Sequence, residues 1–333
     1  DLLQHVFALI FAGYVPALIS PATPALRLNL LVKHFNAKAL IKPKLFTENL
    51  EAVNKLTSIH QYPVAIFENN EKLLTFANEI ILTTSGTSDF SSGCVFDISM
   101  LLCNANKHAD VVGMSAKDMI LINLPLFYSY AFVAQALAAY VTGASLCISS
   151  PPFSCSRYLN DIDKYQVTHS SMTPLLVKEL LSQNVSLPNS LRAFTIGGDT
   201  LDNKYTMQIL KNFPRQEIYL TYGITEAGPR VSTLAAHLAK HEKLSSVGLP
   251  LPGTEVKLSS ETGELLIHSD TILKRRLGPA SKPLFEINET KSWLKTGDIF
   301  TIDADGYLFF QRRISDFVVM RGEKINLAAI KNF

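Results

Sequence analysis

Apolar runs of helical length alternate with shorter runs of strand length along the first two thirds of the chain. Helices are predicted at residues 2–11, 25–35, 130–142 and 174–181. Strands are predicted at residues 14–19, 39–41, 79–83, 119–123, 145–148, 193–196 and 217–220. Such alternation is typical of a parallel sheet with helices on both faces. Residues 1–231 are therefore predicted to have an α/β fold.

Short strands joined by turns replace this alternation after about Ser232. They are predicted in two hairpins, at residues 255–258 with 264–268 and at residues 298–302 with 307–311. The second turn, Asp-Ala-Asp-Gly, resembles half of a calcium loop, but Arg312 stands at the twelfth position, where a glutamate is required. Residues 232–312 are therefore predicted to form a β-rich subdomain.

Composition and charge exclude several classes of function. The 31 basic and 29 acidic residues leave a formal net charge of +2, and no stretch gathers the lysines and arginines that a binder of phosphate backbones needs. Nucleic acid is therefore not expected as a partner. The four cysteines lack C-x-x-C spacing, which predicts reduced thiols and a cytoplasmic location. They are Cys94, Cys103, Cys147 and Cys155.

The apolar residues 1–20 could be taken for a membrane span or a signal peptide. Gln4, His5 and Pro16 interrupt them, and no basic region precedes them. A buried helix followed by a strand is the better interpretation, so no membrane span is expected.

Three segments carry side chains suited to nucleotide chemistry. A Gly, Ser and Thr run at residues 83–93 could surround phosphate oxygens, although it lacks the G-K-[ST] ending of a P-loop. Residues 222–226 follow the strand at 217–220, where α/β sheets bind ligands. Asp298 ends a Thr-Gly-Asp turn and could accept hydrogen bonds from ribose. Each segment alone fits an ordinary loop or turn equally well.

In their order along the chain, these segments resemble the motifs of the AMP-forming superfamily of acyl-CoA synthetases, peptide-synthetase adenylation domains and luciferases. The matching segments are residues 84–93, 125–129, 222–226, 263–265, 296–298, 313–316 and 321–325. The resemblance implies a large N-terminal domain of two mostly parallel sheets with flanking helices at residues 1–231. A small, barrel-like β-rich subdomain at 232–312 and the start of a truncated C-terminal lid at 313–333 would follow.

The resemblance also implies which residues bind the phosphates of ATP and Mg²⁺. Thr225 would contact the α-phosphate, Glu226 would ligate Mg²⁺, and Arg313 would reach ribose or phosphate; these three are the expected catalytic residues. The β- and γ-phosphates would be held by Thr84, Ser85, Gly86, Thr87 and Ser88.

For the nucleoside, the resemblance implies a base pocket and a ribose site. Tyr222 would stack on adenine, and Asp298 would accept hydrogen bonds from both ribose hydroxyls. The base pocket would be lined by Gly198, Asp199, Tyr222, Gly223 and Phe310.

The acid substrate is expected to be an acyl or aryl acid. Amino-acid-activating relatives usually place an aspartate where this chain has Tyr128, although a core aromatic is nearly as good an interpretation of that residue. The candidate lining residues are Tyr128, Ser171, Thr195, Gly197, Thr221, Pro229 and Arg230. His169 is interpreted as a structural histidine with satisfied hydrogen bonds.

The implied reaction is ATP-dependent activation of a carboxylic acid to its acyl-AMP with release of pyrophosphate. The ionised carboxylate attacks the α-phosphorus in line and needs no general base, so the site mainly positions the reactants and stabilises charge. The acyl group would pass to coenzyme A, to a carrier-protein thiol or to an amine.

The sequence departs from the family pattern in two places. The phosphate loop of the family continues Gly-x-Pro-Lys-Gly, whereas Asp89, Ser91 and Ser92 replace its glycine, proline and lysine, which removes a cation. The chain also begins with Asp1 and ends soon after the expected hinge, which suggests a fragment without the catalytic lysine of the lid. A catalytically impaired nucleotide-binding or scaffold relative therefore remains an alternative, as does an unrelated α/β enzyme.

Overall fold

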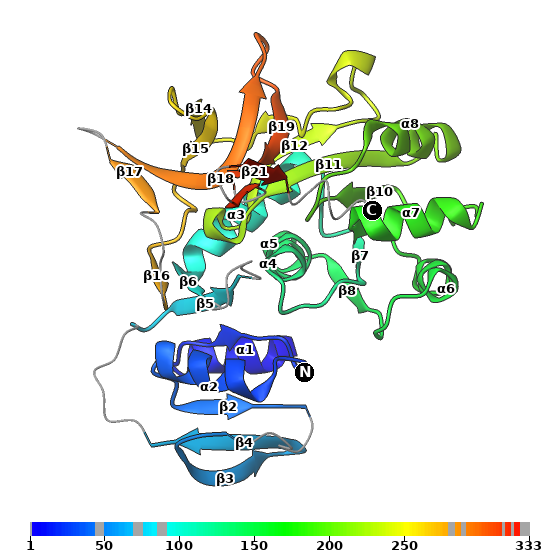
Figure 1. Cartoon of the computed structure of the whole chain (residues 1–333). Coiled ribbons are helices and arrows are strands. Elements are labelled where there is room, and N and C mark those ends of the chain that lie inside the picture. The colour runs from blue at the N-terminus through cyan, green and yellow to red at the C-terminus, as the bar shows by residue number, and fades with distance from the viewer. Residues whose placement is uncertain are drawn as a thin grey trace.

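The structure is a computed structural model of the chain (Figure 1). It describes residues 2–43, 50–68, 76–84, 92–278, 284–287 and 291–314, together with the backbone of residues 317–320 and 323–326. Within these ranges, every helix is too short or too polar to span a lipid bilayer.

The largest element is a seven-stranded sheet with the order β13-β12-β11-β10-β9-β7-β8. Its five parallel strands are β7 (Met119–Ile122), β8 (Ser145–Ile148), β9 (His169–Met172), β10 (Ala193–Ile196) and β11 (Glu217–Gly223). Two antiparallel strands, β12 (Arg230–Ala235) and β13 (Leu249–Pro250), complete it at one edge. The predicted α/β class with a mostly parallel sheet is confirmed for this part of the chain.

Helices cover both faces of this sheet (Figure 1). One face carries α3 (Ile98–Val111) and the continuous run of α4 (Ser129–Ala131), the π-helical η1 (Phe132–Leu137) and α5 (Ala138–Thr142). The other face carries α6 (Cys155–Tyr165), α7 (Pro174–Ser182) and α8 (Asn203–Asn212). Alternate strand residues supply the two cores: Ala193 packs with α3 and η1, and Phe194 packs with α6 to α8.

A second, four-stranded sheet has the order β1-β5-β6-β16. Its strands are β1 (Ala17–Leu18), β5 (Glu79–Thr83), β6 (Gly93–Asp97) and β16 (Arg275–Leu277). Only β1 and β5 are parallel, so the expectation of two mostly parallel sheets is wrong for this one. The direct connection from β5 to β6 has no room for a crossover helix, so the two strands must be antiparallel.

The N-terminal region adds two helices and a small antiparallel sheet (blue in Figure 1). The helices are α1 (Leu2–Phe11) and α2 (Ala25–His34). The sheet has the order β2-β4-β3 and contains β2 (Ala39–Ile41), β3 (Val53–Ile59) and β4 (Tyr62–Phe67). The helix predicted at residues 2–11 and the strand predicted at 39–41 therefore form, whereas the β3–β4 hairpin was not predicted.

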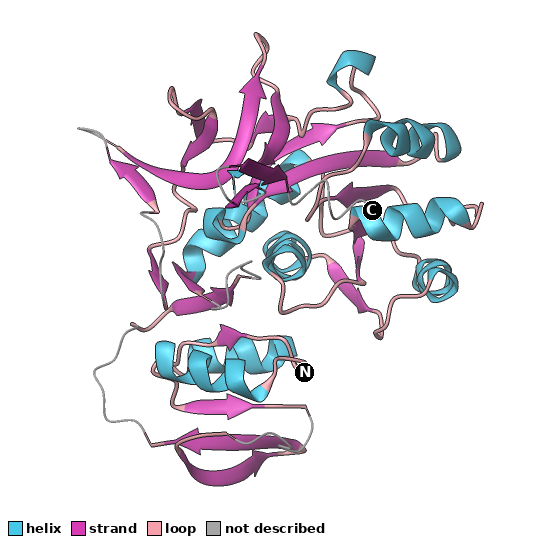
Figure 2. Cartoon of the chain, viewed as in Figure 1, coloured by secondary structure: helices cyan, strands magenta, loops and turns pink. Residues whose placement is uncertain are grey.

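An antiparallel sheet forms within the range predicted to be β-rich, residues 232–312, and lies at the upper left of Figure 2. Its strands are β14 (Glu255–Leu258), β15 (Glu264–His268), β17 (Phe285–Ile287), β18 (Ser292–Ile302) and β19 (Leu308–Arg313), followed by the hairpin of β20 (Phe317–Met320) and β21 (Glu323–Asn326). The described strands leave β14 and β17 as edges and form no closed barrel. Strands β12 and β13, which follow residue 229, belong to the seven-stranded sheet.

The turn at residues 303–306, considered above as half of a calcium loop, is held by an ammonium group. Lys243 Nζ lies 2.5 Å from an Asp303 oxygen and 2.6 Å from an Asp305 oxygen. The side chain of Lys243 is only 13% exposed, so this cation neutralises both carboxylates at close range. The contact ties the β18–β19 hairpin to the segment that follows β12.

A buried carboxylate connects the four-stranded sheet internally. The side chain of Glu79 on β5 is completely buried. Arg275 on β16 donates a bidentate pair of hydrogen bonds to its two carboxylate oxygens, at 2.8 and 2.7 Å. Lys274 and the Phe76 N–H group add further donors at 2.9 Å. Burial alone would raise the pKa of Glu79, but these donors outweigh it and lower the pKa to about 2.

We expect Glu79→Gln to destabilise the protein by about 3 kcal/mol at pH 7. The folded pKa of Glu79, about 2, lies below its ordinary value of 4.5, so the stabilisation is complete above pH 4.5 and is lost as the pH falls through 2. Urea unfolding midpoints of wild type and variant should therefore converge between these pH values. Glu255→Gln is the control, because the Lys291–Glu255 pair is exposed, and ion pairs in contact with water contribute little to stability.

Candidate active site

An aspartate lies between a tyrosine and an arginine where β11 meets the β-rich sheet. The Tyr222 hydroxyl donates to Asp298 Oδ2 at 2.8 Å, and Arg313 Nε donates to Oδ1 at 2.8 Å. Asp298 is 2% exposed. The register of β18 and β19 produces this arrangement, because it pairs Asp298 directly with Arg313. Burial and the neighbouring carboxylate raise the pKa of Tyr222, so it stays a neutral hydrogen-bond donor.

Tyr222 and Phe310, the aromatic residues proposed for the base pocket, both contact the ring of Phe300. Tyr222 contacts Phe300 edge-on with centroids 4.8 Å apart, and Phe310 contacts Phe300 edge-on at 5.6 Å. Phe300 is 2% exposed and was not singled out from the sequence. The sequence indicated only that Phe300 lies in the apolar strand predicted at residues 298–302.

The turn after β11 presents a hydroxyl and a carboxylate. Thr225 Oγ1 and Ser129 Oγ are 3.0 Å apart, which joins this turn to the motif at residues 125–129. Glu226 Oε1 accepts from Arg276 Nη2 at 2.6 Å. Arg276 was missed in the sequence, where the only signal was its place in the basic triplet Lys-Arg-Arg.

The two ends of the phosphate loop lie together. Thr84 and Ser92 are joined by their hydroxyls at 3.1 Å and by a backbone hydrogen bond at 3.2 Å. The other predicted phosphate-binding residues lie outside the described part of the chain: Ser85, Gly86, Thr87 and Ser88. Asp89 and Ser91 also lie outside it.

Four candidates for the acid pocket form one buried polar group on neighbouring strands. Ser171 on β9 and Thr195 on β10 share a hydrogen bond at 2.9 Å, and Arg230 Nη1 donates to Thr221 Oγ1 at 2.7 Å. Tyr130 joins the two pairs, because its hydroxyl lies 3.0 Å from Thr195 Oγ1 and the Arg230 guanidinium stacks 3.8 Å from its ring centre. The structure therefore brings these candidates together and adds Tyr130 to them.

The Arg230 guanidinium is buried without a carboxylate partner among the described residues. Its Nε and Nη2 atoms have no hydrogen-bond acceptor within that part of the chain, and the residue is 3% exposed. Burial lowers the pKa of Arg230, as expected for a cation held away from water. An uncompensated buried charge is unfavourable, so this group is suited to a ligand with acceptor atoms.

Two buried histidines lie near each other, and one of them, His108, also lies near Arg230. Burial and the neighbouring Arg230 charge lower the pKa of His108, and burial lowers that of His169 to about 3, so both rings are neutral. Neither ring nitrogen of either residue has a partner within the described residues. The interpretation of His169 as structural agrees with its burial, but its hydrogen bonds are not satisfied by the described side chains and backbone.

Close packing explains the glycines of the two motifs. A Cβ on Gly223 would lie 2.1 Å from the Pro229 carbonyl oxygen, and one on Gly197 would lie 2.4 Å from Thr221 Oγ1. Both contacts are shorter than van der Waals distance, so a side chain would push apart the strands that hold Thr221 and Arg230. Gly197 and Pro229 thus shape the polar group by their backbone.

The other candidates lie apart from these groups. Tyr128 is 49% exposed, packs on Phe127 with ring centres 4.4 Å apart, and lines a small hollow that also contains Thr84. The core alternative for Tyr128 is therefore wrong. Gly198 has a φ of +89° and lies beside the Tyr130 ring, whereas the exposed Asp199 accepts from the Thr200 N–H group.

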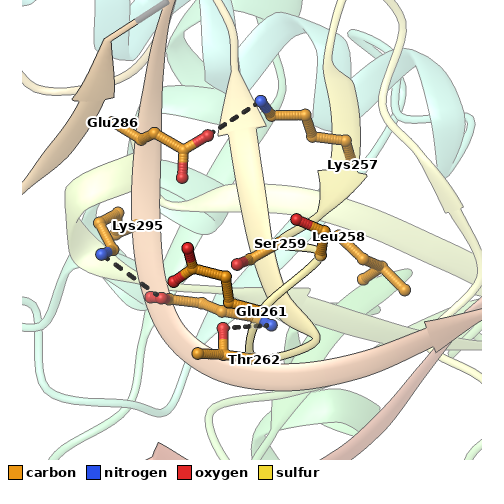
Figure 3. A pocket seen from close by; sticks show the side chains of 9 residues that line it. Lys257, Leu258, Ser259, Glu261, Thr262, Glu286 and Lys295 are labelled. Carbon is orange, nitrogen blue, oxygen red and sulfur yellow. Dashed lines mark hydrogen bonds and ion pairs between the residues drawn. The ribbon is translucent and has the colours of Figure 1, made fainter.

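A larger hollow of about 320 Å³ lies on the β-rich sheet, where Glu261, Thr262, Glu286 and Lys295 converge from the turn after β14 and from β17 and β18 (Figure 3). Its lining contains neither Thr225 nor Glu226 and consists mainly of charged and hydroxyl-bearing side chains. Its link to the site is Glu264, which accepts a hydrogen bond from the Gly297 N–H group at 2.8 Å, next to Asp298. Volume alone therefore does not locate the nucleotide-binding residues.

Tyr222, Thr225 and Glu226 lie at the carboxyl end of the parallel strand β11, and Asp298 of the β-rich sheet meets them there, an arrangement suited to an α/β enzyme that binds a nucleotide. The chain belongs to the AMP-binding enzyme family, whose pattern matches residues 2–275.

Similar proteins include coenzyme A ligases of aryl acids. The chain is 30% identical over 260 residues to a 2-succinylbenzoate–CoA ligase of Bacillus pumilus, an alignment that covers 75% of this chain and 52% of that protein. It is 26% identical to 4-coumarate–CoA ligase 1 of Solanum tuberosum, over 98% of this chain and 67% of that protein. The chain thus spans about half the length of the first of these relatives.

A solved structure shares the fold. The O-succinylbenzoate coenzyme A synthetase (MenE) of Bacillus subtilis, in complex with ATP and magnesium ion, superposes with a TM-score of 0.65 at 26% sequence identity. The match covers 74% of this chain and 52% of that one.

Proposed function

We propose that the protein activates an acyl or aryl carboxylic acid with ATP and Mg²⁺, forming an acyl-AMP and pyrophosphate. The observation that carries this proposal is the convergence of Tyr222, Asp298 and Arg313 with the Thr225–Glu226 turn, in the chain order of the family motifs. The activated acyl group then passes to a thiol or an amine. Coenzyme A is the favoured acceptor, because similar proteins are named as coenzyme A ligases.

The described residues suit ATP as a substrate. Each Asp298 oxygen already accepts one hydrogen bond, and a carboxylate oxygen has a second lone pair for a ribose hydroxyl. Arg313 and Tyr222 hold the carboxylate in a fixed orientation while it binds. The hydroxyls of Thr225 and Ser129 lie close enough to donate to the same phosphate group.

Glu226 suits Mg²⁺ because a carboxylate is a hard oxygen ligand. No cluster of three or more metal-binding side chains occurs among the described residues, so phosphate oxygens and water would complete the octahedron. The ion would supply charge stabilisation for the pyrophosphate leaving group. The protein's own task is to orient the acid carboxylate and the α-phosphate in line.

The polar group around Arg230 supports an acid without an ammonium group. A buried guanidinium repels the α-ammonium group of an amino acid and attracts oxygen acceptors. Hydroxyls of Ser171, Thr195 and Thr221 offer further hydrogen bonds on the same side of Tyr130. The argument against amino acids therefore rests on Arg230 instead of on the exposed Tyr128.

Isotope exchange between pyrophosphate and ATP tests this function on the full-length protein. Acids to be compared are 2-succinylbenzoate, 4-coumarate, a fatty acid and an amino acid. We expect exchange with at least one of the first three and none with the amino acid. ATP binding without exchange for any acid would favour a catalytically impaired relative, for which Asp89 and Ser92 in the phosphate loop are the motivating observation.

A further inference from the structure

Arg276 occupies a position between the end of the phosphate loop and the proposed metal ligand. It lies on β16, whose register pairs it with Cys94 on β6 and pairs Leu277 with Gly93. Strand β6 begins directly after Ser92, whose hydroxyl is hydrogen-bonded to that of Thr84 at the other end of the loop. The pairing of β16 with β6 therefore places a guanidinium beside this loop.

The side chain of Arg276 reaches toward the Thr225–Glu226 turn. Its Nη2 atom donates to Glu226 Oε1 at 2.6 Å, and the two side chains are 23% and 18% exposed. Its Nε atom has no acceptor among the described residues. The Nε atom is buried, so the exposed part of the guanidinium is its terminal end, which a carboxylate holds in place.

Phosphate binding in this region requires a cation from somewhere. Residues 84–92 contain no lysine or arginine and include one aspartate, Asp89. The two basic residues that precede Arg276 in the chain, Arg275 and Lys274, bind the buried Glu79, and Arg313 binds the buried Asp298. Enzymes that transfer nucleotidyl and phosphoryl groups neutralise the departing phosphates with cationic side chains as well as with Mg²⁺.

We propose that Arg276 binds the β- and γ-phosphates of ATP and supplies the positive charge that the phosphate loop lacks. The proposal rests on the proposed function. Glu226 orients the guanidinium through Nη2, and the remaining hydrogens of its terminal nitrogens donate to phosphate oxygens. As the bond between the α-phosphorus and its bridging oxygen breaks, negative charge passes to pyrophosphate, and Arg276 stabilises that charge.

A competing interpretation makes the opposite prediction. If Arg276 instead blocked Glu226 against Mg²⁺, removing its charge would strengthen the binding of ATP in the presence of Mg²⁺. The direction in which ATP affinity changes when the Arg276 charge is removed therefore distinguishes the two interpretations.

Calorimetry with ATP and with AMP, both with Mg²⁺, tests the proposal on the full-length protein. We expect Arg276→Gln to weaken ATP binding by about 10–100-fold, the range for charge-assisted hydrogen bonds, and to leave AMP binding nearly unchanged. Arg276→Lys should fall between, because an ammonium group keeps the charge but not the planar fork. Lys257→Gln, which breaks a pair with Glu286 outside the site, is the matched control and should bind both nucleotides like wild type.

Each outcome decides a separate question. Unchanged or tighter ATP binding by Arg276→Gln, with AMP binding intact, would overturn the proposal and leave the proposed function standing. If Arg276→Gln does not fold, Arg276→Met decides by the same comparison of ATP with AMP, since wild-type affinity for ATP in that uncharged variant overturns the proposal. A wild-type protein that binds no ATP would overturn both the proposed function and the role of Arg276.

Discussion

Glu226→Gln is expected to lower the Mg²⁺-dependent rate of acyl-AMP formation by roughly 100-fold, since even hydrogen-bond partners of metal ligands contribute about 10–100-fold. Glutamine keeps the shape of the side chain and can still accept the hydrogen bond from Arg276. It lacks the negative charge that holds a hard cation. The expected loss is therefore a loss of metal binding and not of local structure.

Acyl-AMP formation by the full-length protein, measured over a range of Mg²⁺ concentrations, checks this result. Glu255→Gln is a suitable control, because Glu255 also pairs with a cation, Lys291, at 2.6 Å but lies on the β-rich sheet. The variant at Glu226 should need more Mg²⁺ to approach the wild-type rate, and the control should not. A Glu226→Gln rate within a few-fold of wild type at every concentration would refute the metal role.

Short apolar strands between clear turn signals were the most predictable elements. Strands β8, β10, β14 and β15 have the bounds expected from the sequence. Each contains a run of apolar residues or an alternation of apolar and polar residues, and polar or glycine-containing segments flank it, so local pattern suffices.

Strand β9 was missed because its sequence, His-Ser-Ser-Met, has no apolar pattern. All four residues are buried, and Ser171 points a hydroxyl toward Thr195. A strand that lines a polar pocket carries polar residues, so it lacks the apolar residues by which strands are recognised in a sequence. The same property that hides β9 from sequence reasoning makes it part of the candidate site.

Pairing between distant segments could not be predicted. Strand β16 joins β6 although about 180 residues separate Arg276 from Cys94 in the chain, and no local signal encodes that register. Helix α3 and the hairpin of β3 and β4 were also missed. Their apolar positions are interrupted by lysine, asparagine and histidine, which tertiary packing tolerates.

Some residues of the candidate site could be predicted from the sequence, and others could not. Tyr222, Thr225 and Asp298 were found because motif order identified them, and the structure brings Tyr222 and Asp298 into contact. Arg276, Tyr130 and Phe300 were not found, because their importance comes from contacts across the fold. Motif order therefore predicts candidate site residues from the sequence, whereas Arg276, Tyr130 and Phe300 become candidates only through their contacts in the structure.

Asp298→Ala is expected to weaken ATP binding by about 10–100-fold, because charge-assisted hydrogen bonds contribute roughly 1.5–3 kcal/mol. The substitution removes the acceptor for the ribose hydroxyls. It also leaves the Tyr222 hydroxyl and Arg313 Nε without their common partner. Asp298→Asn should be intermediate, since one oxygen remains but the charge is lost.

Part of that loss comes from the hydrogen bonds that Tyr222 and Arg313 lose in the variant, so affinity for ATP alone does not isolate the ribose contact. Tyr222→Phe removes one of the two existing hydrogen bonds and keeps the carboxylate. Its effect on ATP binding measures how much the orientation of Asp298 contributes. We expect this effect to be smaller than that of Asp298→Ala, because the ribose acceptor is still present.

Comparison of ATP with 2′-deoxy-ATP by calorimetry isolates the ribose contact. Wild type and Tyr222→Phe should bind ATP more tightly than the deoxy analogue, because Asp298 accepts a hydrogen bond from the 2′-hydroxyl in both. Asp298→Ala should bind the two nucleotides equally, since the acceptor that tells them apart is gone. If wild type does not distinguish the analogues, or if Asp298→Ala still does, Asp298 does not bind the 2′-hydroxyl and serves only to join Tyr222 to Arg313.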